Sequence, residues 1–312
     1  MIKTIIYVII ISVLEVACER EADNVTPPEF KQKIVIGSFL SPNDSITYVN
    51  ISSNQSIFGV IDKNWTITGA KAFISDGTNE IQMDTSKLGF KFNHRIMNIV
   101  AGKTYHIRVE ADNGLKAEAS CLIPAKQNFN LKIDTVTKVE IAPNGYSSSY
   151  FFIQFKFNDI PKISNFYLVK GSIYQYGQFD DYSLYPVISK HFAKMTSDLN
   201  FLNPMFNDQG QDGLQMQIDP EKLYSTEISN VDSVFIVISL LNANKDYYSY
   251  QQSLNNYNDT NDPLTQETPI FSNIVGGIGV FAGYTMDSVV MRIVKKSKII
   301  KNLNLKQNSN FP

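Results

Sequence analysis

The sequence predicts a mainly β protein, in which an N-terminal immunoglobulin-like β-sandwich is followed by a second β-rich domain with one short helix. Short runs with an apolar residue at every second position recur along the chain and are separated by turn residues, which is the pattern of half-buried strands. One segment, NKDYYSYQQSLNNYND, has helical spacing instead. The length of 312 residues fits two domains once a leader is removed.

The N-terminus has the features of a secretory leader. Residues 1–18 read MIKTIIYVIIISVLEVAC, with Lys3 before an apolar run that is too short to span a membrane. Small Ala17 lies directly before Cys18, as in bacterial lipoprotein signal peptides, which this leader resembles. We therefore expect Cys18 to be lipidated. Glu15 stands where such leaders usually carry an apolar residue, so a cleaved secretory signal before an ordinary cysteine is the alternative.

The rest of the chain divides by composition. Residues 19–30 are polar, acidic and broken by prolines, which predicts a flexible tether. The immunoglobulin-like domain is expected over residues 31–126 and the second β-rich domain over residues 127–296. Residues 297–312 lack periodicity and are expected to form a polar, basic tail.

Two local elements of these domains are predicted in detail. The segment AGKTYHIRVEADNGLKAEASCLIP predicts a β-hairpin with its turn at Asp112–Gly114. Its two strands should bury alternate residues: Tyr105, Ile107 and Val109, then Ala117, Ala119 and Cys121. In the helical segment, Asn244 is the expected N-cap.

Composition excludes several classes of function. The formal net charge is -2 and the one basic cluster lies near the C-terminus, so no nucleic-acid face is expected. The two cysteines, Cys18 and Cys121, exclude a disulfide framework if Cys18 is acylated, and Cys121 is expected to be a small buried residue. The histidines lack the spacing of a metal site, and no Gly-x-Ser-x-Gly motif occurs. We expect no catalytic residue, metal or cofactor.

The segment NDQGQDG resembles a calcium loop only in part. Asp208 and Asp212 flank Gly210, but the full ladder of oxygen ligands is missing, so a polar hairpin turn is favoured. If the protein were an envelope hydrolase, these two carboxylates, converging with His191 in a polar pocket, would form its site.

The segment FSNIVGGIGVFAGY has three alternative interpretations: a phosphate cradle, a membrane-active stretch or a packed strand. It lacks the Gly-x-Gly-x-x-Gly spacing and a following helix, and its apolar run is interrupted. We predict an architectural element of the second domain, with a tight turn, a strand from Ile278 to Gly283, and Ile278, Val280 and Ala282 on the opposite face from Gly279, Phe281 and Gly283. Phe281 should be buried, and the Asn273 side chain should bond to backbone. The motif residues are Asn273, Gly276, Gly277, Gly279, Phe281 and Gly283.

The leader ending in Cys18, the hairpin, the FNDQGQDG turn and above all SNIVGGIGVFAGY after a proline resemble the Bacteroidota lipoproteins catalogued as domain of unknown function 4249. The resemblance covers almost the whole chain. It implies an envelope lipoprotein, often encoded near outer-membrane receptors of the TonB-dependent class. Together with the Cys18 leader, the tether and the lack of a catalytic constellation, it leads us to expect a lipid-anchored outer-membrane protein that binds a ligand or partner as an accessory to such a transporter. An envelope hydrolase and a surface adhesion module are the alternatives. The resemblance supplies no catalytic residues.

Overall fold

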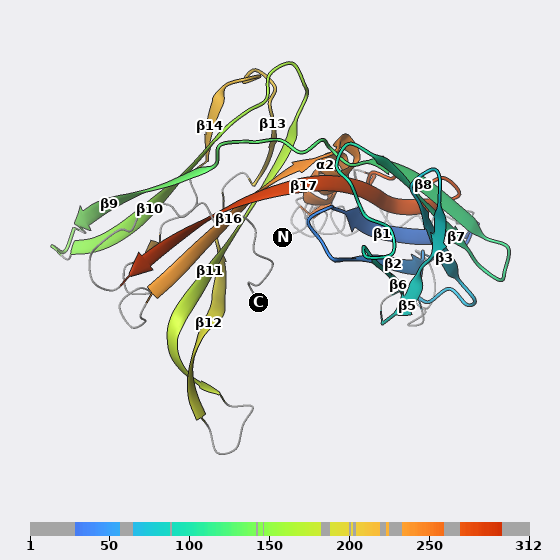
Figure 1. The fold of residues 1–312 in the computed structure, drawn as a ribbon, viewed down its shortest axis with the longest axis horizontal. Helices are drawn as coiled ribbons and strands as arrows, with labels where there is room; N and C mark the ends of the chain where they lie inside the picture. Colours follow the sequence, from blue (N-terminus) through green and yellow to red (C-terminus); the bar gives the residue numbers. More distant parts are fainter. Residues whose placement is uncertain are drawn as a thin grey trace, which may run out of the picture.

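The computed structural model describes residues 29–56, 65–87, 89–141, 143–145, 147–181, 188–199, 201, 204–218, 223–224, 233–258 and 269–294. Within them the protein is mainly β with one helix, as predicted (Figure 1). The expected leader and the tail at 297–312 lie outside the described residues, as does most of the expected tether. Cys18 lies outside them too.

The first eight strands form an N-terminal unit of two facing sheets. Apolar residues alternate along the longer of these strands and point into one core between the sheets, because successive side chains of a strand face opposite ways. The strands are β1 (Ile34–Leu40), β2 (Ile46–Ser53), β3 (Lys71–Ser75), β4 (Glu80–Gln82), β5 (Asp84–Ser86), β6 (Gly89–Asn93), β7 (Thr104–Glu110) and β8 (Lys116–Leu122). The arrangement is sandwich-like, and its immunoglobulin type stays a prediction.

The predicted hairpin is confirmed as β7 and β8. Tyr105 pairs with Cys121, Ile107 with Ala119 and Val109 with Ala117, and all six side chains are buried. At the turn, the Gly114 amide donates to the Ala111 carbonyl at 3.0 Å, and Gly114 has a φ of 84°. Glycine adopts such a backbone without the penalty that a Cβ would bring.

A C-terminal unit follows, and its core lies between one further sheet and the continuation of a sheet of the N-terminal unit. Its elements are β9 (Lys132–Ile141), β10 (Ser147–Asn158), β11 (Phe166–Asp181), β12 (Ile188–Leu199), β13 (Met205–Asn207), β14 (Gln215–Ile218), β15 (Leu223–Tyr224), β16 (Ser233–Ala243), α2 (Lys245–Asn258) and β17 (Gly277–Val294). The core side chains come mainly from β10, β11, β16 and β17.

The long strand β17 belongs to both units (Figure 1). Residues Gly277 to Gly283 pair with β1 in parallel, and residues Tyr284 to Val294 pair with β16 in antiparallel orientation. One sheet with the order β12-β11-β16-β17-β1-β2-β6-β5 therefore runs through the molecule. This placement corrects the prediction that the glycine segment belongs to the second domain. Its first half completes the sheet of the N-terminal unit.

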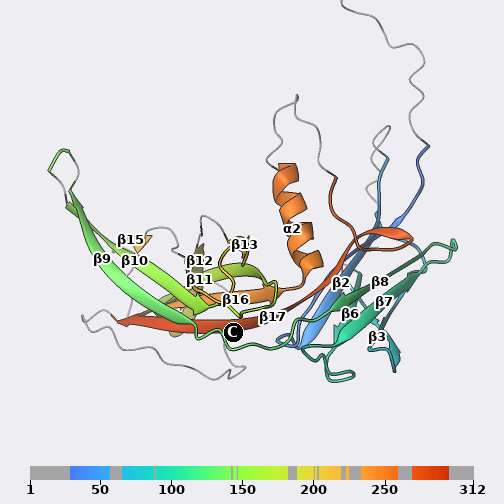
Figure 2. The same ribbon diagram turned by 90° about the horizontal axis from the view of Figure 1, so that it is seen from above.

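The helix α2 packs on the sheet between the two units (Figure 2). The Asn244 side-chain oxygen accepts a hydrogen bond from the Tyr247 amide at 3.0 Å, so the predicted N-cap is confirmed. Tyr247 lies against Phe39, with ring centroids 4.4 Å apart, and belongs to a small cluster with Val280 and Ala282 of β17. The helix thus covers one face of the shared strand.

Candidate functional site

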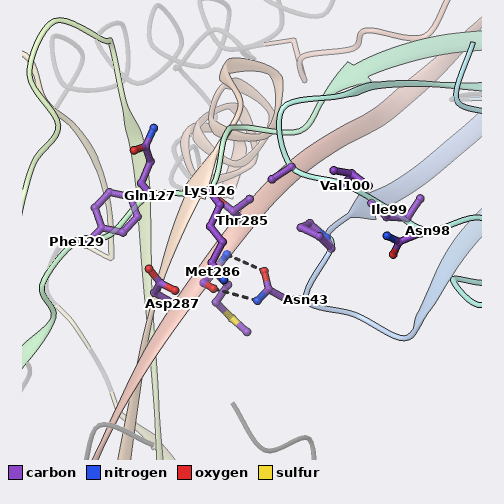
Figure 3. A pocket seen from close by; sticks show the side chains of 12 residues that line it. Asn43, Asn98, Ile99, Val100, Lys126, Gln127, Phe129, Thr285, Met286 and Asp287 are labelled. Carbon is purple, nitrogen blue, oxygen red and sulfur yellow. Dashed lines mark hydrogen bonds between the residues drawn. The ribbon is translucent and has the colours of Figure 1, made fainter. Parts of the chain in front are cut away.

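The strand β17 places two polar residues between the cores of the two units. On the face away from α2, Phe281 belongs to the N-terminal core, and Val289 and Met291 belong to the C-terminal core. Thr285 and Asp287 occupy the positions between them on the same face. The apolar alternation is interrupted there, and a hollow of about 380 Å³, which we call the junction cleft, lies beside these two residues (Figure 3).

Three other segments complete the junction cleft: the β1–β2 turn, the loop of residues 98–101 and the connection of residues 126–129. The Asn43 amide ties the turn to β17, because it donates to the Met286 carbonyl at 3.1 Å and accepts from the Met286 amide at 3.0 Å (Figure 3). The buried Tyr105 hydroxyl holds the loop, accepting from the Val100 amide at 2.8 Å and donating to the Asn98 carbonyl at 3.1 Å. Hydrogen bonds therefore hold two of these three segments in place.

The charged groups of the junction cleft are not paired with each other. Asp287 is half-buried, and this burial raises the pKa of its carboxyl, while nearby Lys126 offsets part of the shift. Neither residue takes part in an ion pair within the part of the chain that the structure describes. The Thr285 hydroxyl is also buried, and it has no hydrogen-bond partner there. Buried polar groups normally have partners, so these side chains identify the cleft as a candidate binding site.

The junction cleft presents groups that can recognise a polar ligand. A carboxylate, an ammonium group and the side-chain amides of Asn98 and Gln127 stand beside the apolar Ile99 and Phe129. The described residues that line the cleft include no histidine or cysteine that could act as a base or nucleophile. A small polar ligand, or a polar segment of a partner, fits this arrangement.

The predicted glycine motif is structural and does not line the junction cleft. Phe281 is fully buried, and Asn273 bonds to both backbone groups of Phe281, accepting at 3.0 Å and donating at 2.8 Å, so both predictions are confirmed. The predicted alternation is also seen, with Val280 and Ala282 on the α2 face. Gly276, with a φ of 74°, forms the turn. The strand itself begins one residue earlier than expected, at Gly277.

The other glycines of the motif allow close approach of neighbouring chain. A Cβ on Gly277 would lie 2.5 Å from the Ile34 carbonyl oxygen, and one on Gly279 would lie 2.1 Å from that of Ile36. A Cβ on Gly283 would lie 2.6 Å from the Ile123 side chain. The pairing with β1 therefore leaves no room for a Cβ at Gly277 or Gly279, and the approach of Ile123 leaves none at Gly283.

The carboxylates of the NDQGQDG segment lie close together, but each already accepts a hydrogen bond from a backbone amide. Asp208 and Asp212 group with Asp159, with one ligand atom from each within 4.8 Å of the others. Asp208 accepts from the Asn165 amide at 2.8 Å, and Asp212 accepts from the Lys162 amide at 2.8 Å. Asp159 accepts from the Tyr167 hydroxyl and, at 2.7 Å, from the Gly213 amide. The carboxylates thus hold a turn between β13 and β14 in place.

Two further predicted residues can be located. His191 lies on β12 opposite Gln178, and its side chain is outside the described residues. Cys121 is buried and forms no disulfide among the described residues, and burial raises the pKa of its thiol well above the usual range. A raised pKa disfavours the nucleophilic thiolate, which agrees with the expected role as a small buried residue.

Sequence comparison decides the family. The model of domain of unknown function 4249 matches residues 19–289. The chain belongs to this family. The match covers the described strands of both units and ends within β17, so the unit of family 4249 includes the junction cleft. No curated protein matches the chain. Among the described residues, no helix is both long and apolar enough to cross a membrane.

Proposed function

We propose that this member of family 4249 is a lipid-anchored protein of the cell envelope that binds a ligand or partner in the junction cleft, as an accessory to a TonB-dependent outer-membrane transporter. The leader ending in Ala17 and Cys18 supports the anchor. The binding role rests on one observation: β17 places the unpartnered Thr285 hydroxyl and the half-buried Asp287 carboxyl in a cleft between two cores. Sites between structural units are common places for ligands.

Binding is favoured over hydrolysis by how the acidic side chains are used. The Asp159, Asp208 and Asp212 carboxylates accept hydrogen bonds from backbone amides, and this fixes a turn. A hydrolytic site would need at least one carboxylate poised toward a substrate. In the junction cleft the half-buried Asp287 carboxyl stands alone, because no second carboxylate and no histidine is among the described residues that line it, so a pair of acid and base groups is not formed there.

The anchor is tested by substitution of the expected lipidation site. Cys18→Ser should abolish incorporation of a labelled fatty acid and release the protein from membranes, because the acyl chains supply the strong attachment. Labelling and membrane fractionation of cells producing each form measure this. An unlabelled wild-type protein would disprove the lipid anchor.

The binding role is tested by affinity purification from intact envelopes with wild type, Asp287→Asn and a matched control, Asp84→Asn, which changes an exposed carboxylate of β5. Wild type and control should recover an outer-membrane receptor. The Asp287 variant should recover about tenfold less, since loss of a charged hydrogen bond costs on the order of 1.4 kcal/mol. Equal recovery by all three forms would exclude the cleft as the contact, and recovery of no receptor by wild type would favour an independent adhesin.

A further inference from the structure

A second hollow lies on the opposite face of β17, between α2 and β2, and is separate from the junction cleft. Its volume is about 460 Å³. The paired sheet residues Gly37 and Val280 form its floor, and Tyr48 of β2, Tyr250 of α2 and Asp44 of the β1–β2 turn also line it. We call this hollow the aromatic trough.

The floor of the aromatic trough is open because residue 37 has no side chain. Gly37 lies within β1 and is not among the glycines with positive φ. A Cβ at this position would meet only the Asn50 Cβ, at an ordinary contact distance of 3.9 Å. Neither the backbone conformation nor crowding by neighbours therefore requires glycine at position 37. The missing side chain leaves open space above the sheet.

The sides of the aromatic trough present aromatic rings. Tyr48 is 60% exposed on the outer face of β2, so packing does not account for its ring. Tyr250 projects from α2 and packs in part on Phe39, with ring centroids 6.1 Å apart. The faces of such rings carry negative potential and attract cations.

One charged residue lines the aromatic trough among those that the structure describes, and it is acidic. The Asp44 carboxylate accepts a hydrogen bond from the Tyr284 hydroxyl at 3.1 Å and takes part in no ion pair within the described chain. Burial raises the pKa of Asp44, and the Tyr284 hydrogen bond and the more distant charges of His94 and Lys170 offset only part of this shift. A positive group bound in the trough would stabilise the charged form of the Asp44 carboxylate and so offset the rest of the cost of its burial.

We propose that the aromatic trough binds an organic cation, a primary ammonium or guanidinium group, held between Tyr48 and Tyr250 with Asp44 as its counter-charge. The recognition combines cation–π attraction with a single carboxylate, and it needs no residue of the junction cleft. The same chemistry is offered by a free amine and by a lysine or arginine side chain of a peptide.

The test titrates the full chain, purified in detergent, with four probes: N-acetyl-lysine methylamide, N-acetyl-arginine methylamide, n-butylammonium and the neutral N-acetyl-norleucine methylamide. Binding is followed by the NMR shifts of the tyrosine rings. We expect saturable binding of the three cationic probes. The norleucine probe should bind about tenfold more weakly, because it has the carbon side chain of lysine without the ammonium group. Tighter binding of the amides than of butylammonium would identify a basic peptide side chain as the ligand, and equal binding would identify a free amine.

Three variants locate the bound cation. Gly37→Val fills the floor, Asp44→Asn removes the counter-charge, and Tyr48→Leu keeps an apolar side chain but removes the ring. Each should weaken cation binding by about tenfold or more, while Asp84→Asn, at an exposed carboxylate on β5, should leave it unchanged. Norleucine binding equal to that of lysine, cation binding insensitive to these variants, or no saturable binding up to about 50 mM would overturn the proposal.

Discussion

At the scale of single residues, Asp287 is a polar group that lowers the stability of the fold and is free to contact a ligand. Its position on β17 falls between Phe281 and Val289, each buried in one core. An apolar residue there would continue the alternation of the strand. The carboxyl is instead half-buried, and its pKa is raised because burial disfavours the charged form. Binding sites commonly contain such locally unfavourable groups.

Replacing this carboxyl should therefore stabilise the protein at neutral pH. A raised pKa in the folded state means that folding favours the protonated acid. The free energy of unfolding of the wild type therefore falls as the pH rises from the usual carboxyl pKa of 3.8 through the folded-state pKa. Asp287→Asn removes this loss and should raise the melting midpoint at pH 7 by roughly 2 °C. Thermal melts from pH 7 to pH 4 should show the gain shrinking toward low pH, and a gain that grows with acid would contradict the assignment.

At the scale of elements, β17 changes its partner in mid-strand, and two asparagines complete its hydrogen bonding. On the β16 side, the Asn273 amide bonds to both backbone groups of Phe281 before the pairing with β16 begins. On the β1 side, the Asn43 amide does the same for Met286 after the pairing with β1 ends. Each asparagine side chain thus takes the place of a neighbouring strand at one residue. It forms hydrogen bonds with the backbone N–H and C=O groups of that residue, which would otherwise lack a partner.

The parallel pairing with β1 depends on the missing side chain of Gly277. Gly277→Val would drive a Cβ against the Ile34 carbonyl oxygen, at 2.5 Å, and should lower the free energy of unfolding by about 3 kcal/mol. Gly37→Val is the matched control, because it places the same side chain in the same strand pair with its nearest contact at 3.9 Å. Denaturant unfolding of both variants measures the difference. Equal stability would show that β17 does not need the close approach.

At the scale of the whole molecule, the shared strand couples the two units. Residues Gly277–Gly283 are part of the N-terminal sheet and residues Tyr284–Val294 are part of the C-terminal sheet, with no loop between them. Unfolding of the N-terminal unit would remove β1, the sheet partner of Gly277–Gly283, from the first half of β17. We therefore expect the two units to unfold together, unlike domains joined by a linker.

This coupling can be measured with Phe281→Ala, which should cost about 4 kcal/mol because it empties a fully buried site. Trp65, the one tryptophan, lies beside β2 and reports on the N-terminal unit, whereas circular dichroism reports on all strands. Both signals should shift to lower denaturant by the same amount. Val139→Ala, at a residue 61% exposed on β9, is the control and should shift neither. Separate midpoints for the two signals would show independent domains.

The sequence by itself determined the features that depend on neighbours along the chain. The alternation in β7 and β8 with the turn at Gly114, the Asn244 cap of α2 and the burial of Phe281 were all predictable, because each rests on periodicity or capping within a few residues. The Asn273 contacts span only eight residues and were predictable for the same reason. The family also followed from the sequence alone.

Only the tertiary structure decided which strands β17 joins and where the hollows lie. Ile34 and Gly277 are far apart in the sequence, and no local pattern states that glycines at 277 and 279 admit the backbone of β1 instead of another strand. In the sequence, Thr285 and Asp287 are recognisable only as polar residues at inward-facing strand positions. That they line a cleft is known only from the folded structure, in which residue 43 and the segments 98–101 and 126–129 surround them. Pairing and enclosure are long-range properties, since each depends on side chains whose proximity exists only after the chain has folded.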